Sequence, residues 1–350
     1  MKILVVGPQY RDSFANNIAV TLQAMGHTVV CADEGISRRL GESRYVTAFW
    51  SILHGAFPAL GRLYFNSLIR QAAKLQPDLV LVVHSQAPPE VIERVKESCA
   101  AKVVCWFTDS ILGLYRQYLL GAPYDAVFLK EPFLVRAFRE KLGINAHYLP
   151  ECCNPLWHKR MTLTRQEELL YGCDLAAIGT LHYYRAGMLK DFASRDLKIW
   201  GVTAPSWVGS PLHRNYTNHY VVAKDKAKAL VAAKVVINPI LFAEIEGVNC
   251  TLFEAAGCGA FQIADWKPAL AELFEPEREI VTFRTRQELK EKVEYYLAHP
   301  EERAEISMRS YERAHREHTY QVRLNKMLGV LGFASEPLST LELAEFPRRK

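Results

Sequence analysis

The chain has 350 residues, of which 49% are hydrophobic and 23% charged, a balance that excludes a disordered protein. This length is too great for one ordinary core, so we expect two domains. The net charge of +5 is mild, suits an anionic ligand or an acidic surface, and gives no support to nucleic-acid binding.

The amino-terminal segment and the cysteines indicate a cytoplasmic protein. The opening MKILVVGPQY has a short apolar run that Gly7 and Pro8 end, unlike a signal peptide. Its apolar stretches stay below the roughly 18 to 20 residues of a membrane-spanning helix. The eight cysteines form no C-x-x-C pair and match no histidine spacing, so we expect buried, reduced thiols and no zinc site.

Short apolar runs alternate with helical segments through the first half of the chain. Strands are predicted at residues 2–6, 28–32, 78–83, 102–107, 124–129 and 146–150. Ser13 is placed to cap the first helix and Gly26 to end it, and further helices are predicted over residues 89–98 and 132–142. Strands this apolar are buried on both faces, which is typical of a parallel sheet covered by helices.

The same rhythm returns in the second half. Strands are predicted at residues 174–179, 197–201, 234–240, 260–264 and 279–283, and helices at 183–193, 224–233, 250–256, 286–299, 300–318 and 319–331. Residues 151–170 break the rhythm with proline and charge, which indicates a linker. We therefore expect an α/β protein of two tandem Rossmann-like domains, residues 1–160 and 161–325, with a helix end and tail over 326–350. Their strand-end loops would face each other across a ligand-binding cleft.

One segment, residues 45–75, does not fit this rhythm because it is rich in aromatic side chains. A helix packed on the sheet is favoured by residues at helical spacing, namely Leu60, Leu63, Tyr64, Ser67, Leu68 and Ala72. The alternative is an exposed apolar surface that meets a lipid-linked acceptor, a membrane face or a partner protein.

The stretch from Glu244 to Asp265, EIEGVNCTLFEAAGCGAFQIAD, holds the strongest candidate site. Seven residues separate Glu246 from Glu254, and Asn249 between them is a good helix N-cap, with Gly257 as the helix stop. Glu246 then lies in a strand-end loop and Glu254 on the helix, where free N–H groups favour an anion and a carboxylate can accept hydrogen bonds from a ribose diol. The alternative is that both glutamates are surface charges and the glycines and alanines serve packing.

The usual nucleotide-binding motifs are missing. The first strand leads into GPQYRDS and not into G-x-G-x-x-G, so NAD or FAD is poorly supported there. The chain has neither the G-x-x-x-x-G-K-[ST] of a P-loop nor the G-x-S-x-G of a nucleophile elbow.

Glu246-x7-Glu254, the following AAGCGAFQIAD and the run PALAELFEPEREIVTFRTRQELKEKVEYYLAHPEERAEI resemble the donor domain of GT-B glycosyltransferases. More narrowly, the chain resembles the CgeB-like, group 1 glycosyltransferase family, strongly over residues 235–325 and more weakly over 75–235. The resemblance implies the GT-B fold, a nucleotide-sugar donor with UDP-sugar favoured, and no cofactor or essential metal. The family often carries arginine where this chain has Thr251, in NCTLFE.

Carried over residue by residue, the resemblance places Glu254 on the donor ribose and Glu246 beside the donor sugar. Gly179 and Thr180 would lie near the diphosphate, together with the helix start at Asn249. Arg185 would neutralise phosphate charge, with Lys267 as the second candidate.

Two residues of the first domain are catalytic candidates because they follow strands. His84 follows the strand over 78–83 and Asp109 the strand over 102–107, so both would face the donor. The alternatives are that His84 is a structural histidine, that Asp109 caps the next helix, and that Arg185 is surface charge. Asp109 as a general base implies inversion of the anomeric centre, whereas the Glu-x7-Glu resemblance favours retention.

The sequence therefore predicts a metal-independent glycosyltransferase of the hexosyl type, acting on an acceptor glycan, lipid-linked glycan or protein. Another enzyme of this fold, such as a sugar-nucleotide epimerase or a phosphorylase, is one alternative. A non-catalytic nucleotide-sugar binding protein is the other, which the Thr251 departure supports.

Overall fold

The computed structural model describes residues 1–32, 58–83, 87–109, 111, 116–201 and 211–334, and the side chains of residues 58–64 lie outside this description. The chain forms two compact units, one of Met1–Pro150 with Leu324–Lys350 and one of Glu151–Arg323. Each unit is built on its own parallel sheet.

The first unit holds a six-stranded sheet in the order β2-β1-β3-β4-β5-β6. Its strands are β1 (Lys2–Val6), β2 (Thr28–Ala32), β3 (Leu79–Val83), β4 (Lys102–Phe107), β5 (Ala126–Leu129) and β6 (Ala146–Tyr148). All pairings are parallel. The strands in the middle of the sheet are buried along their length, as expected for a sheet that helices cover on both faces.

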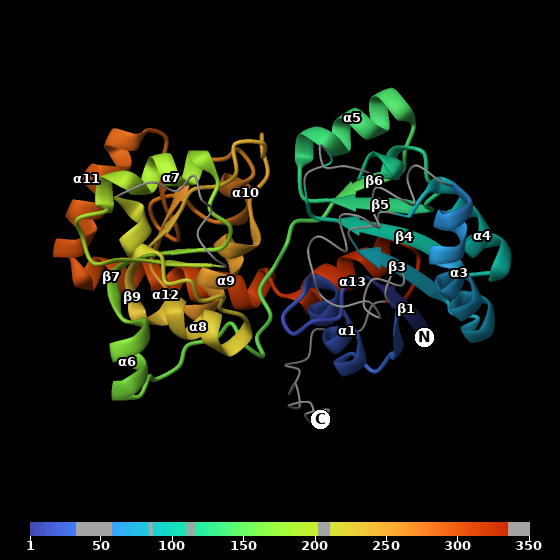
Figure 1. Ribbon diagram of the computed structural model, residues 1–350, viewed down its shortest axis with the longest axis horizontal. Coiled ribbons are helices and arrows are strands. Elements are labelled where there is room, and N and C mark those ends of the chain that lie inside the picture. Colours follow the sequence, from blue (N-terminus) through green and yellow to red (C-terminus); the bar gives the residue numbers. More distant parts are fainter. Residues whose placement is uncertain (33–57, 84–86, 110, 112–115, 202–210, 335–350) are drawn as a thin grey trace. The chain divides into compact units, whose positions relative to one another are not determined.

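Helices in this unit are α1 (Phe14–Ala24), α3 (Pro58–Leu75), α4 (Pro89–Ser98) and α5 (Pro132–Leu142) (Figure 1). Ser13 caps α1 as expected, because its hydroxyl accepts a hydrogen bond from the N–H of Asn16 at 3.0 Å. Phe65, Leu68 and Ala72 of α3 are buried against the sheet. The helical part of the aromatic segment therefore contributes to the core, whereas residues 45–57 lie outside the described residues and a membrane contact there stays a prediction.

The second unit holds a five-stranded sheet in the order β11-β10-β9-β7-β8. Its strands are β7 (Cys173–Ile178), β8 (Leu197–Trp200), β9 (Ala233–Asn238), β10 (Gln262–Asp265) and β11 (Val281–Phe283), again all parallel. The chain runs from β7 outward to β8 and then returns to place β9 on the other side of β7. This reversal makes the β7–β9 pair the topological switch point, where ligands of open α/β sheets bind.

Helices of the second unit are α6 (Arg165–Tyr171), α7 (Tyr183–Leu189), α8 (Ala223–Ala232), α9 (Cys250–Cys258), α10 (Leu270–Leu273), α11 (Arg286–Ala298) and α12 (Pro300–Glu317). Alternate residues of β7 point to opposite faces. Leu175 and Ala177 pack in the core that α7 and α11 share, whereas Ala176 and Ile178 pack with α8 and α9. The last helix of the chain, α13, spans Tyr320–Val330.

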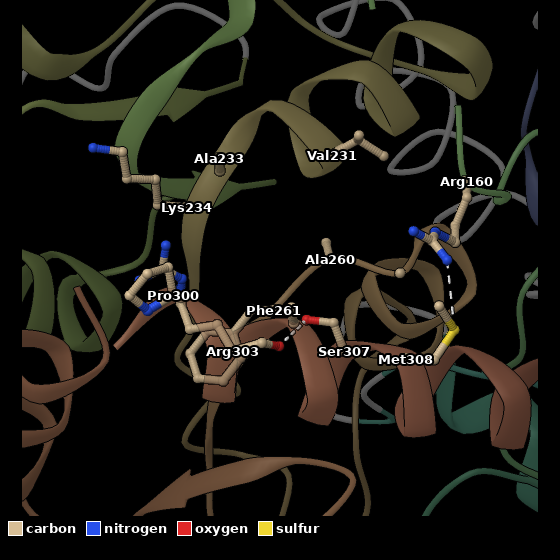
Figure 2. A pocket seen from close by; sticks show the side chains of 12 residues that line it. Arg160, Val231, Ala233, Lys234, Ala260, Phe261, Pro300, Arg303, Ser307 and Met308 are labelled. Atoms are coloured by element: carbon tan, nitrogen blue, oxygen red, sulfur yellow. Dashed lines mark hydrogen bonds between the residues drawn. The ribbon is translucent and has the colours of Figure 1, made fainter. Parts of the chain in front are cut away.

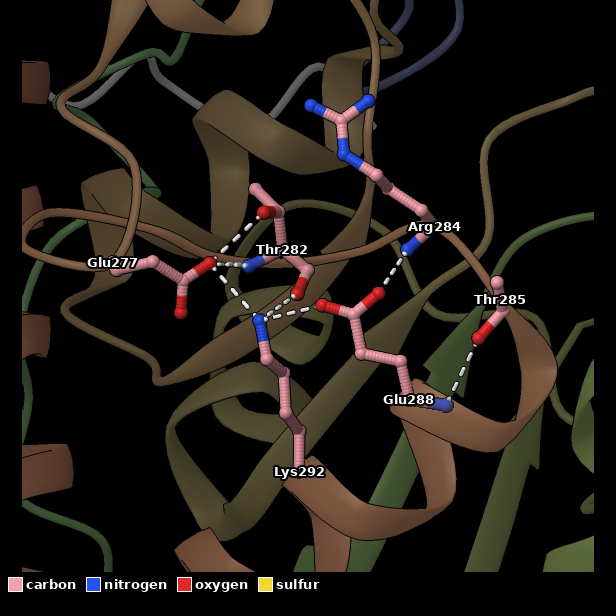
Figure 3. Close-up of polar contacts among 6 residues, drawn as sticks. All are labelled: Glu277, Thr282, Arg284, Thr285, Glu288 and Lys292. Carbon is pink, nitrogen blue, oxygen red and sulfur yellow. Dashed lines mark hydrogen bonds and ion pairs between the residues drawn. The ribbon is translucent and has the colours of Figure 1, made fainter.

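The turn into α11 is fixed by a polar network (Figure 3). Thr285 caps the helix by accepting from the N–H of Glu288, whose carboxylate accepts from the N–H of Arg284 at 2.8 Å. Lys292, one turn further on, contacts the carboxylates of Glu288 at 2.9 Å and Glu277 at 3.1 Å. These contacts hold the segment that follows β11, so that Arg284 lies over the ring of Trp266, with 4.1 Å between the guanidinium carbon and the ring centre.

The prediction that Gly257 ends the helix was wrong. The helix α9 runs through Gly257 to Cys258, and Gly259 caps it in the left-handed conformation with φ +67°. Gly257 serves packing instead: a Cβ there would lie 2.8 Å from the Cβ of Cys153. The two glycines therefore have different roles, since Gly259 ends the helix and Gly257 allows close packing.

The cysteine prediction holds for most of the thiols. Six of the eight are buried, whereas Cys31 is exposed and Cys250 partly so, and all eight are free thiols. Burial raises the pKa of Cys153 to about 12, so this thiol stays protonated near neutral pH. Within the described residues, the helices fall short of the length and apolar character that a bilayer crossing requires.

Candidate functional site

The candidate site of the second unit lies at the switch point of its sheet. The loop after β7 begins at Gly179, and the loop after β9 begins at Pro239 and ends at Asn249. Because β7 and β9 are parallel neighbours, both loops leave the same edge of the sheet. Gly179, Thr180, Arg185, Glu246, Asn249 and Glu254 all belong to these loops or to the helices that follow them.

Arg185 joins the two loops. Its Nη1 donates to the carbonyl oxygens of Ile178 and Thr180, both at 3.0 Å, and its Nη2 donates to the carbonyl of Pro239 at 3.2 Å. Gly179 adopts a φ of +102°, and a Cβ at this position would lie 3.2 Å from Arg185 Nη1. The glycine therefore lets the backbone wrap closely around the guanidinium.

Arg185 has a structural role in this geometry, and its expected contact with phosphate stays a prediction. Burial lowers its pKa from the usual value, yet arginine remains charged at any physiological pH. The guanidinium stabilises the two loops by donating to their carbonyls. Thr180 is exposed beside it. The positive charge thus lies at the loop where the diphosphate is expected.

Asn249 caps α9 as predicted. Its side-chain oxygen accepts from the N–H of Leu252 at 3.2 Å, and its amide nitrogen donates to the side-chain oxygen of Asn238 at 2.8 Å. Asn238 closes β9, and its own amide donates back to Asn249 at 3.1 Å. This reciprocal amide pair fixes the start of α9 against the end of the strand.

Glu254 lies one turn into α9 and is 7% exposed. Its Oε1 forms an ion pair with Lys226 of α8 at 2.8 Å, and His158 Nε2 is 3.8 Å from the same oxygen. Both contacts use Oε1, and the second carboxylate oxygen makes no hydrogen bond or ion pair with the described residues. A buried carboxylate with a charged partner is costly to build for packing alone.

The loop that carries Glu246 is held by hydrogen bonds from the segment that follows β10. The N–H of Ala269 donates to the carbonyl of Glu246 at 3.0 Å, and the Lys267 ammonium donates to the carbonyl of Glu244. Glu246 itself is half-buried. Lys267 therefore positions this loop, and its expected phosphate contact stays a prediction.

Three side chains near this edge were missed by the sequence reasoning. Lys226 lies among several lysines of an amphipathic helix, and its spacing gives no signal that it meets Glu254. Tyr184, on the first turn of α7, donates its hydroxyl to Asp265 at the end of β10 at 2.6 Å. Burial raises the pKa of Asp265, and the tyrosine hydrogen bond partly opposes this shift. The pair joins residues 81 positions apart, which no local pattern reveals.

The remaining catalytic candidates belong to the first unit. Asp109 is exposed two residues beyond the end of β4, as the strand pattern predicts. His84 lies outside the described residues. The alternative in which Asp109 caps a helix over the following residues also falls largely on residues outside the description.

Comparison with known proteins agrees with this architecture. Residues 185–329 match the family model described as glycosyl transferase-like. The chain is 25% identical to the spore protein CgeB of Bacillus subtilis (strain 168), over 67% of this chain and 77% of that protein. The resemblance stated from the sequence is thereby confirmed, and the matched residues contain Arg185, Glu246 and Glu254.

Solved structures show the same fold. Sucrose-phosphate synthase from Thermosynechococcus elongatus matches with a TM-score of 0.68 at 12% identity, covering 95% of this chain and 98% of that one. Anabaena HepE in complex with UDP-glucose matches with a TM-score of 0.64 at 13% identity, covering 95% and 99%. A glycosyltransferase from Rickettsia africae matches with a TM-score of 0.64 at 14% identity, covering 94% and 97%. The fold is GT-B, with its two parallel α/β sheets, as predicted.

Proposed function

We propose that this protein is a glycosyltransferase that moves a hexosyl group from a nucleotide sugar, with UDP-sugars favoured, to a hydroxyl of a glycan, lipid-linked glycan or protein. The glycosyl transferase-like match over residues 185–329 supports the reaction class. The neighbour that was solved with UDP-glucose supports the choice of nucleotide, because it shares the fold over nearly the whole chain.

One observation carries the proposal, namely the buried carboxylate of Glu254 at the switch-point edge of the sheet. Its Oε1 is paired with Lys226, and its second oxygen makes no hydrogen bond or ion pair with the described residues. A ribose hydroxyl can donate to that free oxygen, while Lys226 keeps the carboxylate ionised and oriented. The cost of burying the charge is thus offset partly by the ion pair and further by the ligand.

The leaving diphosphate needs positive charge as its bond to the sugar breaks. Arg185 lies on the first turn of α7 and Lys267 on the loop after β10, and the N-terminal end of α9 adds backbone N–H groups. We propose that these groups stabilise the leaving group without a metal ion. We further propose retention: the acceptor oxygen bonds to the anomeric carbon on the face that the diphosphate leaves, and the hydroxyl proton passes to a phosphate oxygen.

A panel of UDP-, GDP-, dTDP- and ADP-sugars tests the proposal. We expect at least one of them to yield free nucleoside diphosphate, through transfer or slow hydrolysis, and this release to persist in EDTA. An altered sugar with no release of nucleotide would identify an epimerase. A shift in melting temperature with neither change would identify a binding protein.

The measurement in EDTA tests the metal-independent model separately. If chelation abolishes nucleotide release and Mg²⁺ or Mn²⁺ restores it, then the metal-independent leaving-group model is wrong. The assignment of a glycosyltransferase would stand in that case.

A further inference from the structure

A second pocket lies on the opposite edge of the sheet of the second unit, with a volume of about 270 Å³. Its lining includes Ala233, where β9 begins, and Gly259 to Phe261, which lead into β10. The candidate donor site lies where β9 ends. A six-residue strand spans roughly 17 Å, so the two sites are separate.

The lining of this pocket is strongly cationic. Among its twelve residues are Arg160, Lys234 and Arg303, and none of the twelve is acidic. One carboxylate partly offsets this charge. Asp174 pairs with Lys234 at 2.7 Å, and its negative charge also raises the pKa of Arg303. A positive excess remains, which favours an anionic occupant.

Arg303 is the half-buried member of the three. Its Nη1 donates to the carbonyls of Tyr296 and Leu297 at the end of α11, whereas its Nε and Nη2 groups make no hydrogen bond with the described residues. Burial lowers its pKa, a cost that Asp174 only partly offsets. The guanidinium is thus fixed in place with donors left over for a ligand.

Arg160 lies at the other end of the pocket (Figure 2). Its Nη1 contacts the sulfur of Met308 at 3.5 Å, and it pairs with no carboxylate among the described residues. The methylene stem rests on Gly259, where a Cβ would lie 2.9 Å from Arg160 Cγ. Because Gly259 has no side chain, the stem of Arg160 can pack directly on its backbone. Figure 2 shows Lys234, Pro300 and Arg303 grouped at the opposite end.

Apolar groups lie between the two cationic ends. Val231, Phe261 and Met308 contribute hydrocarbon surface, and Ser307 contributes a hydroxyl. The volume is close to the lower limit of small-molecule sites, about 300 Å³. We propose that this pocket is a second ligand site that binds a small organic bisphosphate, one phosphate on Arg160 and the other on Arg303 and Lys234.

Calorimetric titration with fructose 1,6-bisphosphate as the probe tests this site without any nucleotide sugar. We expect one molecule bound per chain. Arg160→Gln and Lys234→Gln should each raise Kd roughly tenfold, because each removes a hydrogen bond between two charged groups. Both side chains are exposed, so the variants are expected to fold. The neighbour Lys159, exposed and absent from the pocket lining, supplies the matched control, and Lys159→Gln should leave Kd within about twofold.

Three outcomes would overturn this proposal. They are no binding at millimolar probe, an equal loss of affinity in Lys159→Gln, and displacement of the probe by UDP, which would place it in the donor site. Since the titration needs neither transfer nor a donor, its result is independent of the proposed transferase activity.

Discussion

Glu254 is the residue on which the donor-site proposal depends most. We expect Glu254→Gln to weaken UDP binding by about 1.5 to 3 kcal/mol, the cost of losing a hydrogen bond to a charged group. The variant also removes the negative charge that Lys226 contacts at 2.8 Å, so part of the loss would arise from the weakened ion pair. Calorimetric titration with UDP measures the change.

Glu294→Gln is the matched control for that measurement. Glu294 is an exposed carboxylate of the same unit that pairs with Arg195, on a helix that does not carry the candidate site. Its replacement should leave UDP affinity unchanged, because exposed pairs contribute little. A folded Glu254→Gln protein that binds UDP as tightly as the wild type would refute the ribose assignment.

Gly257 illustrates a residue whose role depends on its neighbours. An added methyl group would lie 2.8 Å from Cys153 Cβ and 3.0 Å from its sulfur. We therefore expect Gly257→Ala to lower the free energy of unfolding by about 1 to 3 kcal/mol, the usual cost of overpacking. Denaturant unfolding gives the value.

The control for this substitution is Gly187→Ala in α7. Gly187 is also helical, but a Cβ there meets nothing within 4 Å. Alanine should stabilise that helix by up to about 1 kcal/mol. Equal destabilisation by both substitutions would show that the contact with Cys153 is not the cause.

At the scale of single elements, the sequence predicts best where local chemistry decides the boundary. The helices Pro89–Ser98 and Pro132–Leu142 were predicted to the residue, because proline opens both and Gly143 adopts a φ of +63° at the end of the second. The helix stop at Gly257 was misplaced, because both Gly257 and Gly259 satisfy the local pattern. The sequence does not show that Gly257 packs against Cys153 while Gly259 adopts the left-handed cap conformation.

Local sequence patterns did not predict which residues contact the side chains of the candidate site. Arg185 donates to Pro239, 54 positions away, and Lys226 meets Glu254, 28 positions away. Spacing along one helix reports which side chains share a face, but the neighbour across an interface depends on how the layers pack. The sequence thus indicated the candidate glutamates and the arginine without the contacts that orient them.

The junction between α12 and α13 carries a pH-dependent element. His318 is 4% exposed, donates from Nε2 to the carbonyl of Leu273 at 2.6 Å, and accepts at Nδ1 from Arg323 at 2.9 Å. Burial, followed by the charge of Arg323, lowers its pKa to about 3. The imidazole is therefore neutral in the folded protein, in the tautomer that these two contacts require.

This lowered pKa makes the fold sensitive to mild acid. Between pH 6.5 and pH 3 the unfolded chain binds a proton at His318 that the folded protein does not, so stability falls as the pH falls. The loss from pH 7 to pH 5 should be about 2 kcal/mol. Denaturant unfolding at the two pH values, compared with His318→Gln, isolates this contribution. A variant with the same pH dependence as the wild type would contradict it.

At the scale of the whole molecule, the apolar strands predicted two parallel sheets, and both are present. The strand order was not predicted, because β7 pairs with β9 although β8 lies between them in the chain. That order is what creates the switch point at which Gly179, Arg185 and Asn249 gather. The candidate site therefore depends partly on long-range strand pairings, which local sequence patterns do not predict.

The two units allow donor binding to be separated from transfer. All the proposed donor-binding residues lie in Glu151–Arg323, whereas Asp109 lies in Met1–Pro150. If Asp109 orients the acceptor hydroxyl for transfer, then Asp109→Asn should lower kcat by a factor of about 10² to 10⁴, the range for a group that positions a reacting proton. The affinity for UDP should stay unchanged, because the substituted group belongs to the other unit.

The control for this prediction is Glu140→Gln, which replaces an exposed carboxylate of α5 in the same unit as Asp109 and should change neither kcat nor UDP affinity. A fall in UDP affinity equal to the fall in kcat would mean that Asp109 acts on the donor and not on the transfer.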